Sequence, residues 1–284
     1  MANIDPNLSA DAASRPSRVG CVSYLNSKPL IENLQDHPGL WIHFDVPSKL
    51  IDSLLKNDVD IALCPVIDYF RHQSDLAVVP AGGICSAGQT FTVRLYSRTP
   101  LEKITRIHAD VDSHTSIVLL QVLMDELFNI KPQLVPYDAR QEIAEHHPLI
   151  DAPAMLLIGD KVVTDGPSML DYPHQLDLGQ AWNKLTGLPF VFAVWMARQK
   201  TPLGDLPALL AKQRELNDPK RDEIARRYAP KHHWPEDLAV RYLCTLLHFK
   251  IGQAEISAMQ LFAQKASRLG LVPPPSPVVL RSIA

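Results

Sequence analysis

Three apolar runs separated by amphipathic segments occupy the first quarter of the chain, and this alternation limits the fold more than any other feature. The runs are residues 18–22, "LWIHFDV" and "IALCPV". Between them, apolar residues recur at helical spacing, as in residues 47–55, where Ser48 is a candidate cap. An order of strand, helix, strand, helix and strand predicts a parallel sheet with helices on its faces, hence an α/β fold.

The rest of the chain adds more strands and then only helices. "TFTVRLYS", "APAMLLIGD" and "LPFVFAVWMA" are typical of strands, "PAGGICSAGQ" indicates turns, and the sequence from Leu203 onward reads as helices. The strand-rich region divides near residues 97–103 and again near 195–203. We therefore expect two lobes, with residues 18–98 and 197–284 in lobe 1, residues 99–196 in lobe 2, and residues 1–17 as a disordered tail. A two-lobed chain of this kind places its site in the cleft between the lobes.

Composition excludes several function classes. A formal net charge of -3 without a basic block gives no footprint for nucleic acid or an anionic membrane. The longest apolar run, residues 188–197, is about half of what a membrane-spanning helix needs. The N-terminal stretch lacks the apolar core of a secretory signal, so we expect a cytoplasmic protein with a small-molecule ligand. Scattered cysteines and the adjacent pairs His146–His147 and His232–His233 do not have metal-ligand spacing, so no metal is expected.

Polar side chains gather where strands end. They fall in four groups: Tyr24 and Asn26; Ser86, Gly88 and Gln89; Ser113, Thr115 and Ser116; Gly159 and Asp160. If parallel strands bring these ends together, they form a neutral pocket rich in hydroxyl and amide groups. The helix expected after "SHTS" would add backbone N–H groups and the positive end of its dipole. Such a pocket suits a carboxylate.

Each of these residues also has a structural interpretation. Serine and threonine before an apolar run are most often helix caps, Asn26 could stabilise its own turn, and Asp160 could cap the next one. The chain lacks a G-x-G-x-x-G after a strand and a phosphate-binding loop, so no nucleotide cofactor is expected. From the residues alone, the protein closes on a small anionic ligand, and transport and catalysis both stay open.

Several stretches resemble the chorismate dehydratase family, which opens the futalosine route to menaquinone. They occur in the family's order and cover most of residues 18–200: "VSYLNSKPL", "DVDIALCPVIDYF", "TFTVRLYSR", "SHTSIVLLQVLM", "MLLIGDKVV" and "DLGQAWNKLTGLPFVFAVWMAR". The last is the most specific because of its length. The C-terminal stretch "YLCTLLHFKIGQAEISAMQLF" is similar in character but looser.

The resemblance implies a fold like type 2 periplasmic binding proteins, with a site in the interlobe cleft and C-terminal helices. It implies a lyase without a cofactor that removes water from chorismate to give 3-[(1-carboxyvinyl)oxy]benzoate. It also implies site residues. Asn26 is the expected catalytic partner of the substrate, with Asp160 as a second catalytic candidate; the expected substrate-binding residues are Tyr24, Ser86, Ser113, Thr115, Ser116 and Gly159. The base is either the enolpyruvyl carboxylate of the substrate or Asp160.

Two residues depart from the family's pattern. Lys28 stands where an apolar or small residue is expected, and His114 where the family often has arginine, so both would add positive charge at the cleft edge. The alternatives are the sister enzyme that acts on cyclic dehypoxanthine futalosine and a binding or sensing protein for small anions. We expect the lobes to close on the ligand, with the hinge at "TFTVRLYS" and "FVFAVWMA". The oligomeric state stays open, with a homodimer as one candidate.

Overall fold

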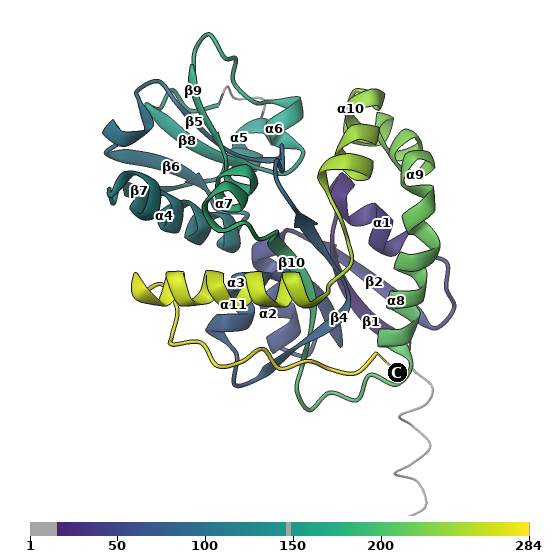
Figure 1. The fold of residues 1–284 in the computed structure, drawn as a ribbon. Coiled ribbons are helices and arrows are strands. Elements are labelled where there is room, and N and C mark those ends of the chain that lie inside the picture. The colour runs from purple at the N-terminus through teal and green to yellow at the C-terminus, as the bar shows by residue number, and fades with distance from the viewer. Residues whose placement is uncertain (1–15, 146–148, 284) are drawn as a thin grey trace, which may run out of the picture.

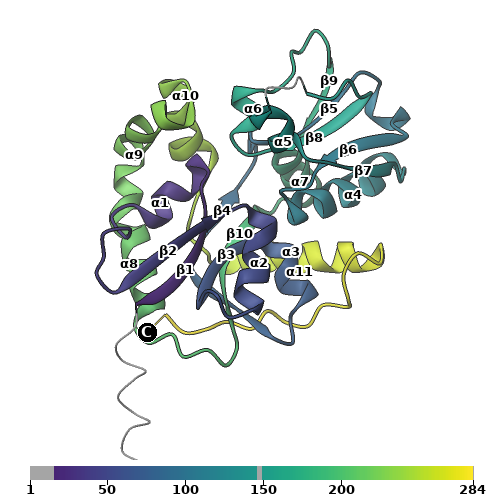
Figure 2. The same cartoon turned by 180° about the vertical axis from the view of Figure 1, so that it is seen from behind.

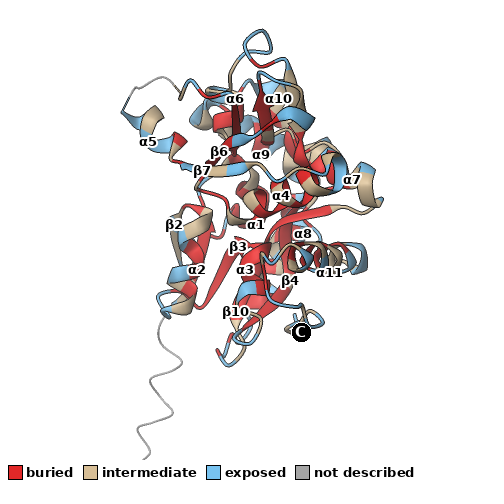
Figure 3. Ribbon diagram, turned by 90° about the vertical axis from the view of Figure 1, so that its left-hand side faces the viewer, coloured by how far each residue is buried: buried red, intermediate tan, exposed pale blue. Residues whose placement is uncertain are grey.

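Two five-stranded sheets form the framework of the protein, one in each of two lobes (Figures 1 and 2). The computed structural model describes residues 16–145 and 149–283. Residues 1–15 of the expected tail and the pair His146–His147 therefore lie outside the described residues, while Ser17 begins the first strand. Buried residues concentrate in the strands of both sheets and in the helices that cover them (Figure 3).

The sheet of lobe 1 has the order β2-β1-β3-β10-β4. Its strands are β1 (Ser17–Val22), β2 (Leu40–Asp45), β3 (Ile61–Pro65), β4 (Leu76–Ser86) and β10 (Phe190–Arg198). Strand β1 pairs in parallel with β2 and β3, as the alternation of strands and helices predicts, because each crossover carries a helix. The last strand to enter, β10, is antiparallel to both β3 and β4.

The sheet of lobe 2 repeats this plan in the order β7-β6-β8-β5-β9. Its strands are β5 (Val93–Ser97), β6 (Arg106–Asp110), β7 (Gln133–Tyr137), β8 (Ala154–Ile158) and β9 (His174–Asp177). Strand β6 is parallel to β7 and β8, and β5 is antiparallel to β8 and β9. Each sheet is thus mixed, with three parallel strands extended by an antiparallel pair.

Helices cover both sheets and make up the C-terminal region. They are α1 (Lys28–Ile31), α2 (Pro47–Leu55), α3 (Val66–Arg71), α4 (His114–Phe128), α5 (Ala139–Ala144), α6 (Lys161–Thr164), α7 (Leu178–Thr186), α8 (Leu206–Asn217), α9 (Arg221–Tyr228), α10 (Glu236–Arg241) and α11 (Gln253–Arg268). Helix α8 packs on β4 and α1, whereas α11 packs on β10 and reaches α4 of the other lobe (Figure 1). No helix in the described part of the chain is long and apolar enough to cross a membrane.

The chain changes sheets earlier than the sequence indicates. Strand β5 belongs to the second sheet and β10 to the first, so the crossings are residues 87–92 and 187–189 instead of the regions near 98 and 196. Local patterns favoured breaks at "SRTP" and after "WMAR", because both are turn-rich. The pairing of each strand with distant partners decides its lobe, and no local pattern reports that pairing.

The stretch "PAGGICSAGQ" is not mainly a turn, because most of it lies in β4. One edge of β4 pairs with β10. Its other edge exchanges main-chain hydrogen bonds with the segment at His248 and Phe249, including Gly83 N to Phe249 O at 3.0 Å and Cys85 N to His248 O at 3.0 Å. These long-range bonds hold the two adjacent glycines in extended backbone, against their local tendency to turn.

Gly179, at the start of α7, allows the first crossing to pack closely against that helix. A Cβ atom at this position would overlap Thr90 Oγ1 and lie 2.7 Å from Ser86 Oγ. The same crossing is tied to the helix by Asp177, which accepts hydrogen bonds from the main-chain N–H groups of Thr90 at 2.9 Å and Phe91 at 2.6 Å. The crossing is therefore fixed against α7 by both packing and hydrogen bonds.

Replacement of Gly179 by Ala is expected to lower the free energy of unfolding by about 2 kcal/mol or more, because the added methyl group forces the crossing away from α7. Urea denaturation measures this change. Gly39→Ala is the control, since its Cβ would meet only the exposed His37 ring at 3.4 Å, and it should remain within about 1 kcal/mol of the wild type. Equal stability of the two variants would contradict the close approach at Gly179.

Candidate active site

A cavity that is partly open to solvent lies between the two lobes. It is lined by Val22, Tyr24, Asn26, Pro47, Pro65, Ile84, Thr90, Thr92, Val93, Ser113, Ser116, Ile158, Gly159, Phe192, Ala193 and Tyr242. This lining, drawn from the described residues, contains no charged side chain. Hydroxyl, amide and apolar groups make up the walls, which matches the neutral pocket expected from the strand ends.

The cavity lies where the strand order changes direction in both sheets. In lobe 1, Val22 ends β1 and Pro65 ends β3, and these two strands are neighbours. The chain continues from β1 to β2 and from β3 to β4, which lie in opposite directions along the sheet. In lobe 2, the corresponding neighbours are β6 and β8, whose last residues are Asp110 and Ile158. Such switch points open a crevice beyond the carboxyl ends of the strands. Here the two crevices face each other across one cavity.

Asn26 is held in a tight turn between β1 and α1. Ser27 closes this turn, since its hydroxyl is within hydrogen-bond distance of the carbonyl oxygens of Val22 at 2.8 Å and Tyr24 at 2.9 Å. Leu25 is fully buried and anchors the same turn in the core of lobe 1. The backbone at Asn26 is therefore fixed, and its side chain lines the cavity.

The Asn26 amide has one satisfied end and one free end. Its Nδ2 donates to the hydroxyl oxygen of Tyr242 at 3.1 Å. Its Oδ1 is buried and has no hydrogen-bond partner among the described residues. A buried acceptor without a partner costs free energy. Its presence in a cavity therefore indicates a ligand that donates a hydrogen bond to it.

Sequence reasoning missed Tyr242, Thr90 and Thr92, which also line the cavity. Tyr242 comes from the C-terminal helical region, more than two hundred residues after Asn26. Its hydroxyl also lies 2.7 Å from Thr92 Oγ1. Both threonines lie in "TFTVRLYS". Their hydroxyl groups in an otherwise mainly apolar run are the feature that could have indicated a site. Nothing in the sequence indicated that Tyr242 meets them.

Helix α4 begins at the cavity wall. Ser113 is its N-cap, and the Ser113 hydroxyl accepts from the main-chain N–H of Ser116 at 3.1 Å while donating to Ser116 Oγ at 2.8 Å. Both serines line the cavity. The first N–H groups of a helix have no acceptor within the helix, and the helix dipole places positive potential there. This wall therefore favours an anionic group without offering a cationic side chain.

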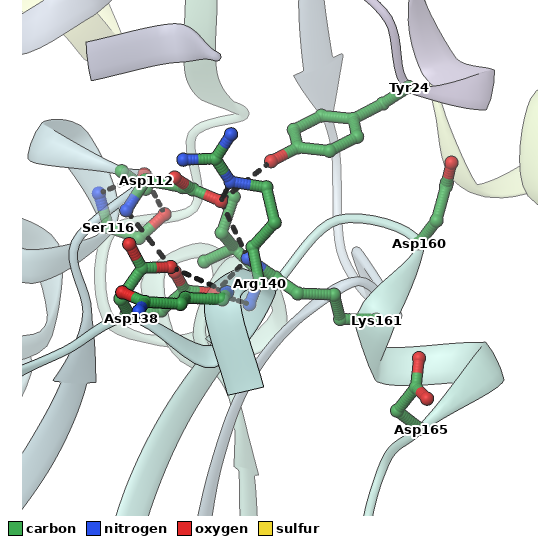
Figure 4. A network of polar contacts seen from close by, with 12 residues as sticks. Tyr24, Asp112, Ser116, Asp138, Arg140, Asp160, Lys161 and Asp165 are labelled. Atoms are coloured by element: carbon green, nitrogen blue, oxygen red, sulfur yellow. Dashed lines mark hydrogen bonds and ion pairs between the residues drawn. The ribbon is translucent and has the colours of Figure 1, made fainter. Parts of the chain in front are cut away.

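A buried ion network lies behind that helix start (Figure 4). Lys161 Nζ lies 2.7 Å from a carboxylate oxygen of Asp110 and 2.7 Å from one of Asp112, and Arg140 Nε approaches Asp112 at 3.6 Å. Burial raises the pKa of Asp110 above its usual range. Because Asp112 directly precedes the cap of α4, its pairing with cations prevents its charge from repelling an anion at the helix start.

Tyr24 reaches across the cavity to this network. Its hydroxyl donates to Asp112 Oδ2 at 3.3 Å (Figure 4), and burial raises the pKa of Tyr24, so the phenol stays protonated. Its ring lies against Gly159, whose φ of +71° is in the left-handed region. A Cβ at Gly159 would come within 3.2 Å of the ring. Gly159 thus provides both the turn and the space for Tyr24.

Ser86 and Thr115, two predicted substrate-binding residues, lie outside the cavity lining. Ser86 is fully buried, and its hydroxyl lies 2.9 Å from that of Thr90 in the first crossing. Thr115 is 1% exposed, and its hydroxyl accepts from the main-chain N–H of Ile67 at 3.3 Å. Both hydroxyls are engaged by protein groups, and Thr115 links α4 of lobe 2 to α3 of lobe 1.

Asp160 also lies outside the lining, in a contact between the lobes. Its Oδ2 accepts from the main-chain N–H of Leu25 at 3.3 Å and lies 2.8 Å from His232 Nδ1. Leu25 and His232 belong to lobe 1, whereas Asp160 starts α6 of lobe 2 (Figure 2). Asp160 therefore links the two lobes across the cleft, and we call its contacts with Leu25 and His232 the clasp.

Lys28 and His114 do not line the cavity, although both lie on elements that border it. Lys28 is buried, with Nζ 5.4 Å from the ring centre of Phe44 and 5.2 Å from that of Tyr228, and burial lowers its pKa. His114 Nδ1 lies 2.9 Å from a carboxylate oxygen of Asp68. This histidine therefore has a carboxylate beside it, and no sequence pattern predicts that contact because Asp68 and His114 lie on different lobes.

Comparison with known proteins agrees with this description. Residues 17–268 match the model of a family described as menaquinone biosynthesis. A chorismate dehydratase of Thermus thermophilus is 30% identical over 202 residues, which are 66% of this chain and 72% of that protein. A chorismate dehydratase of Campylobacter jejuni is 26% identical over 263 residues, which are 89% of this chain and 98% of that protein.

The fold also matches a solved binding protein. The alkanesulfonate-binding protein SsuA of Xanthomonas axonopodis pv. citri, bound to MOPS, superposes with a TM-score of 0.63 at 17% identity and covers 94% of this chain and 97% of its own. The predicted α/β fold of the periplasmic binding protein type is thereby confirmed. With the family model covering most of its length, the chain belongs to the menaquinone biosynthesis family.

Proposed function

We propose that this protein is a chorismate dehydratase, a lyase that converts chorismate to 3-[(1-carboxyvinyl)oxy]benzoate and water. The main support is that two relatives of that name align with it, one of them over 89% of the chain. The cavity between the lobes is the proposed active site. Its neutral walls, with the start of α4 on one side and the unpartnered Asn26 Oδ1 on the other, suit a substrate that carries carboxylates and one hydroxyl.

In the proposed complex, a substrate carboxylate lies at the start of α4. Ser113 and Ser116 border this position, and the positive end of the helix dipole lies there. The paired state of Asp112 keeps the local potential favourable. Gly159 and Tyr24 shape the neighbouring part of the wall, where the apolar ring of the substrate would rest.

The reaction removes the proton at C3 and the hydroxyl at C4. The C3–H and C4–O bonds break, a C3=C4 double bond forms, the ring becomes aromatic, and the hydroxyl leaves as water after taking up a proton. Aromatisation supplies the driving force, so the protein has mainly to orient the substrate and stabilise its charges. Asn26 Oδ1 is placed to accept a hydrogen bond from the C4 hydroxyl, which orients that group for departure.

The base in this proposal is the enolpyruvyl carboxylate of the substrate. The described residues that line the cavity include no carboxylate, histidine or lysine. Asp160, the protein group that competes for this role, has its Oδ2 engaged by Leu25 and His232. A carboxylate attached through the ether oxygen at C3 is close to the C3 proton, and the acid it forms can return that proton to the departing hydroxyl.

The variant Asp160→Asn distinguishes between the two candidate bases, the substrate carboxylate and Asp160. If Asp160 acts only in the clasp, the variant should keep kcat within about tenfold of the wild type while KM rises, because the contact with His232 is weakened and the closed lobes are less favoured. Steady-state kinetics with chorismate measure both constants. A fall in kcat of about 1,000-fold with unchanged chorismate binding would instead identify Asp160 as the base.

The function itself is tested by incubating the purified protein with chorismate in buffer without added metal or nucleotide. Liquid chromatography with mass spectrometry should reveal a product lighter than chorismate by one water. Chorismate recovered unchanged from folded protein would contradict the proposal. Calorimetric titration with chorismate and other small carboxylates would then distinguish a binding protein from an enzyme with another substrate.

A further inference from the structure

Tyr242 joins the C-terminal region of the chain to the proposed active site. It is 1% exposed and lines the cavity. It begins a π-helical turn, Tyr242–Leu246, directly after α10 (Glu236–Arg241). Such turns insert one extra residue per turn and often occur at functional sites, where they redirect a side chain.

The ring of Tyr242 is fixed by stacking. It lies on the Trp234 ring with a centroid distance of 4.8 Å and an interplanar angle of 23°. Trp234 is itself buried and contacts the Phe91 ring in the first crossing at 6.4 Å. Packing on these aromatic groups sets the position of the Tyr242 hydroxyl independently of its hydrogen bonds.

The hydroxyl joins two polar residues of the cavity wall. Asn26 Nδ2 donates to the Tyr242 oxygen at 3.1 Å, and Thr92 Oγ1 lies 2.7 Å from the same oxygen. A phenol has one hydrogen to donate, and an amide nitrogen cannot accept it. With Asn26 Nδ2 facing Tyr242, the hydroxyl oxygen accepts from the amide, and the hydroxyl hydrogen is left to donate to Thr92 Oγ1.

In this arrangement the hydrogen bond at Tyr242 engages one end of the Asn26 amide and leaves the other end free. With Nδ2 bound, Oδ1 is the end without a partner among the described residues. If the Tyr242 hydroxyl were absent, the amide could rotate and present either end to the cavity at similar cost. An amide presenting Nδ2 would not accept a hydrogen bond from a substrate hydroxyl.

We propose that Tyr242, fixed by Trp234 and Thr92, is the positioning residue that holds the Asn26 carbonyl oxygen toward the substrate. This inference rests on the proposed function for the role of Asn26, but the anchoring itself can be measured without turnover. Tyr242 acts as a neutral hydrogen-bond partner, because burial raises its pKa well above that of a free phenol.

Tyr242→Phe tests the proposal, because phenylalanine keeps the stack on Trp234 and removes only the hydroxyl. We expect kcat for chorismate to fall by about tenfold or more while KM changes by less than about threefold. The double variant Asn26→Ala with Tyr242→Phe should be no slower than Asn26→Ala alone, because two residues that act through one contact are not additive.

Tyr69→Phe is the matched control. Tyr69 is also buried, and its hydroxyl accepts one hydrogen bond, from the main-chain N–H of Val279 at 2.8 Å, away from the cavity. This variant should keep the wild-type kcat. An unchanged kcat in Tyr242→Phe, or multiplied losses in the double variant, would overturn the positioning role.

A spectroscopic measurement keeps the test independent of the substrate. In protein labelled with ¹⁵N-asparagine, the Asn26 side-chain signal is identified by its disappearance in Asn26→Ala. Its hydrogen exchange should be slow in the wild type and at least about tenfold faster in Tyr242→Phe, with no change in Tyr69→Phe. Equal exchange in the wild type and Tyr242→Phe would overturn the anchoring, even if chorismate proved not to be the substrate.

Discussion

Asn26→Ala is expected to lower kcat for chorismate by about 100-fold or more while the protein remains folded. The variant removes the Asn26 carbonyl oxygen, a buried side-chain acceptor in the cavity that has no partner among the described residues. It leaves the wall formed by Ser113 and Ser116 intact, so KM should change by less than about fivefold. The loss then reflects orientation of the departing hydroxyl more than substrate binding.

Steady-state kinetics and thermal unfolding of the same preparation measure this prediction. Asn183→Ala is the control, because Asn183 Nδ2 donates to the Leu188 carbonyl at 3.1 Å and the residue does not line the cavity. That variant should lose some stability and keep its kcat. Full activity in Asn26→Ala would remove Asn26 from the mechanism and leave Tyr242 without a positioning role.

Lys161→Met is expected to lower the free energy of unfolding by about 3 to 5 kcal/mol near neutral pH. Methionine fills a similar volume but leaves two buried carboxylates without their shared cation. Asp110 should account for most of the loss. Its side chain is 0% exposed, and among the described residues its other donors are the main-chain N–H groups of Asp112 and Ile158.

The deficit of Lys161→Met should depend on pH with a defined sign. Burial already raises the pKa of Asp110 in the folded protein, and loss of the lysine would raise it further. A raised folded-state pKa means that the folded state binds the proton more tightly than the unfolded state. Stability of the variant should therefore improve relative to the wild type as the pH falls from about 8 to about 5.

Urea denaturation at several pH values measures both effects. Lys131→Met is the matched control, since Lys131 is 76% exposed and lies 3.8 Å from Asp125 at the surface. It should change stability by less than about 1 kcal/mol at every pH. A deficit in Lys161→Met that is equally small, or that does not vary with pH, would show that the buried network is not held together by charge pairing.

Much of the fold could be predicted because it depends on local patterns. The alternation of apolar runs and helical segments predicts the parallel arrangement of β1, β2 and β3. The division of the strand-rich region predicts two lobes, which the resemblance to a known family also implies. The lobe boundaries could not be predicted in the same way. Strands β5 and β10 are assigned to their sheets by pairing with distant strands, and β4 contains glycines that local rules assign to turns.

The residues of the candidate site also differ in whether local sequence patterns predict them. The residues that follow strand ends or start a helix at the cleft, Tyr24, Asn26, Ser113, Ser116 and Gly159, line the cavity, as the strand-end argument places them. Their roles stay predictions. Ser86, Thr115 and Asp160 follow the same pattern, but their side chains bind protein groups. Tyr242 has no local signal, because its contact with Asn26 spans 216 positions in the sequence.

The measurement that tests the central claim most directly is proton NMR of chorismate during incubation with the purified wild-type protein. The account predicts that the ring signals change from a cyclohexadiene to a 1,3-disubstituted benzene while the two enolpyruvyl methylene protons remain. An unchanged spectrum, or a product that has lost the enolpyruvyl group, would contradict the assignment of this protein as a chorismate dehydratase.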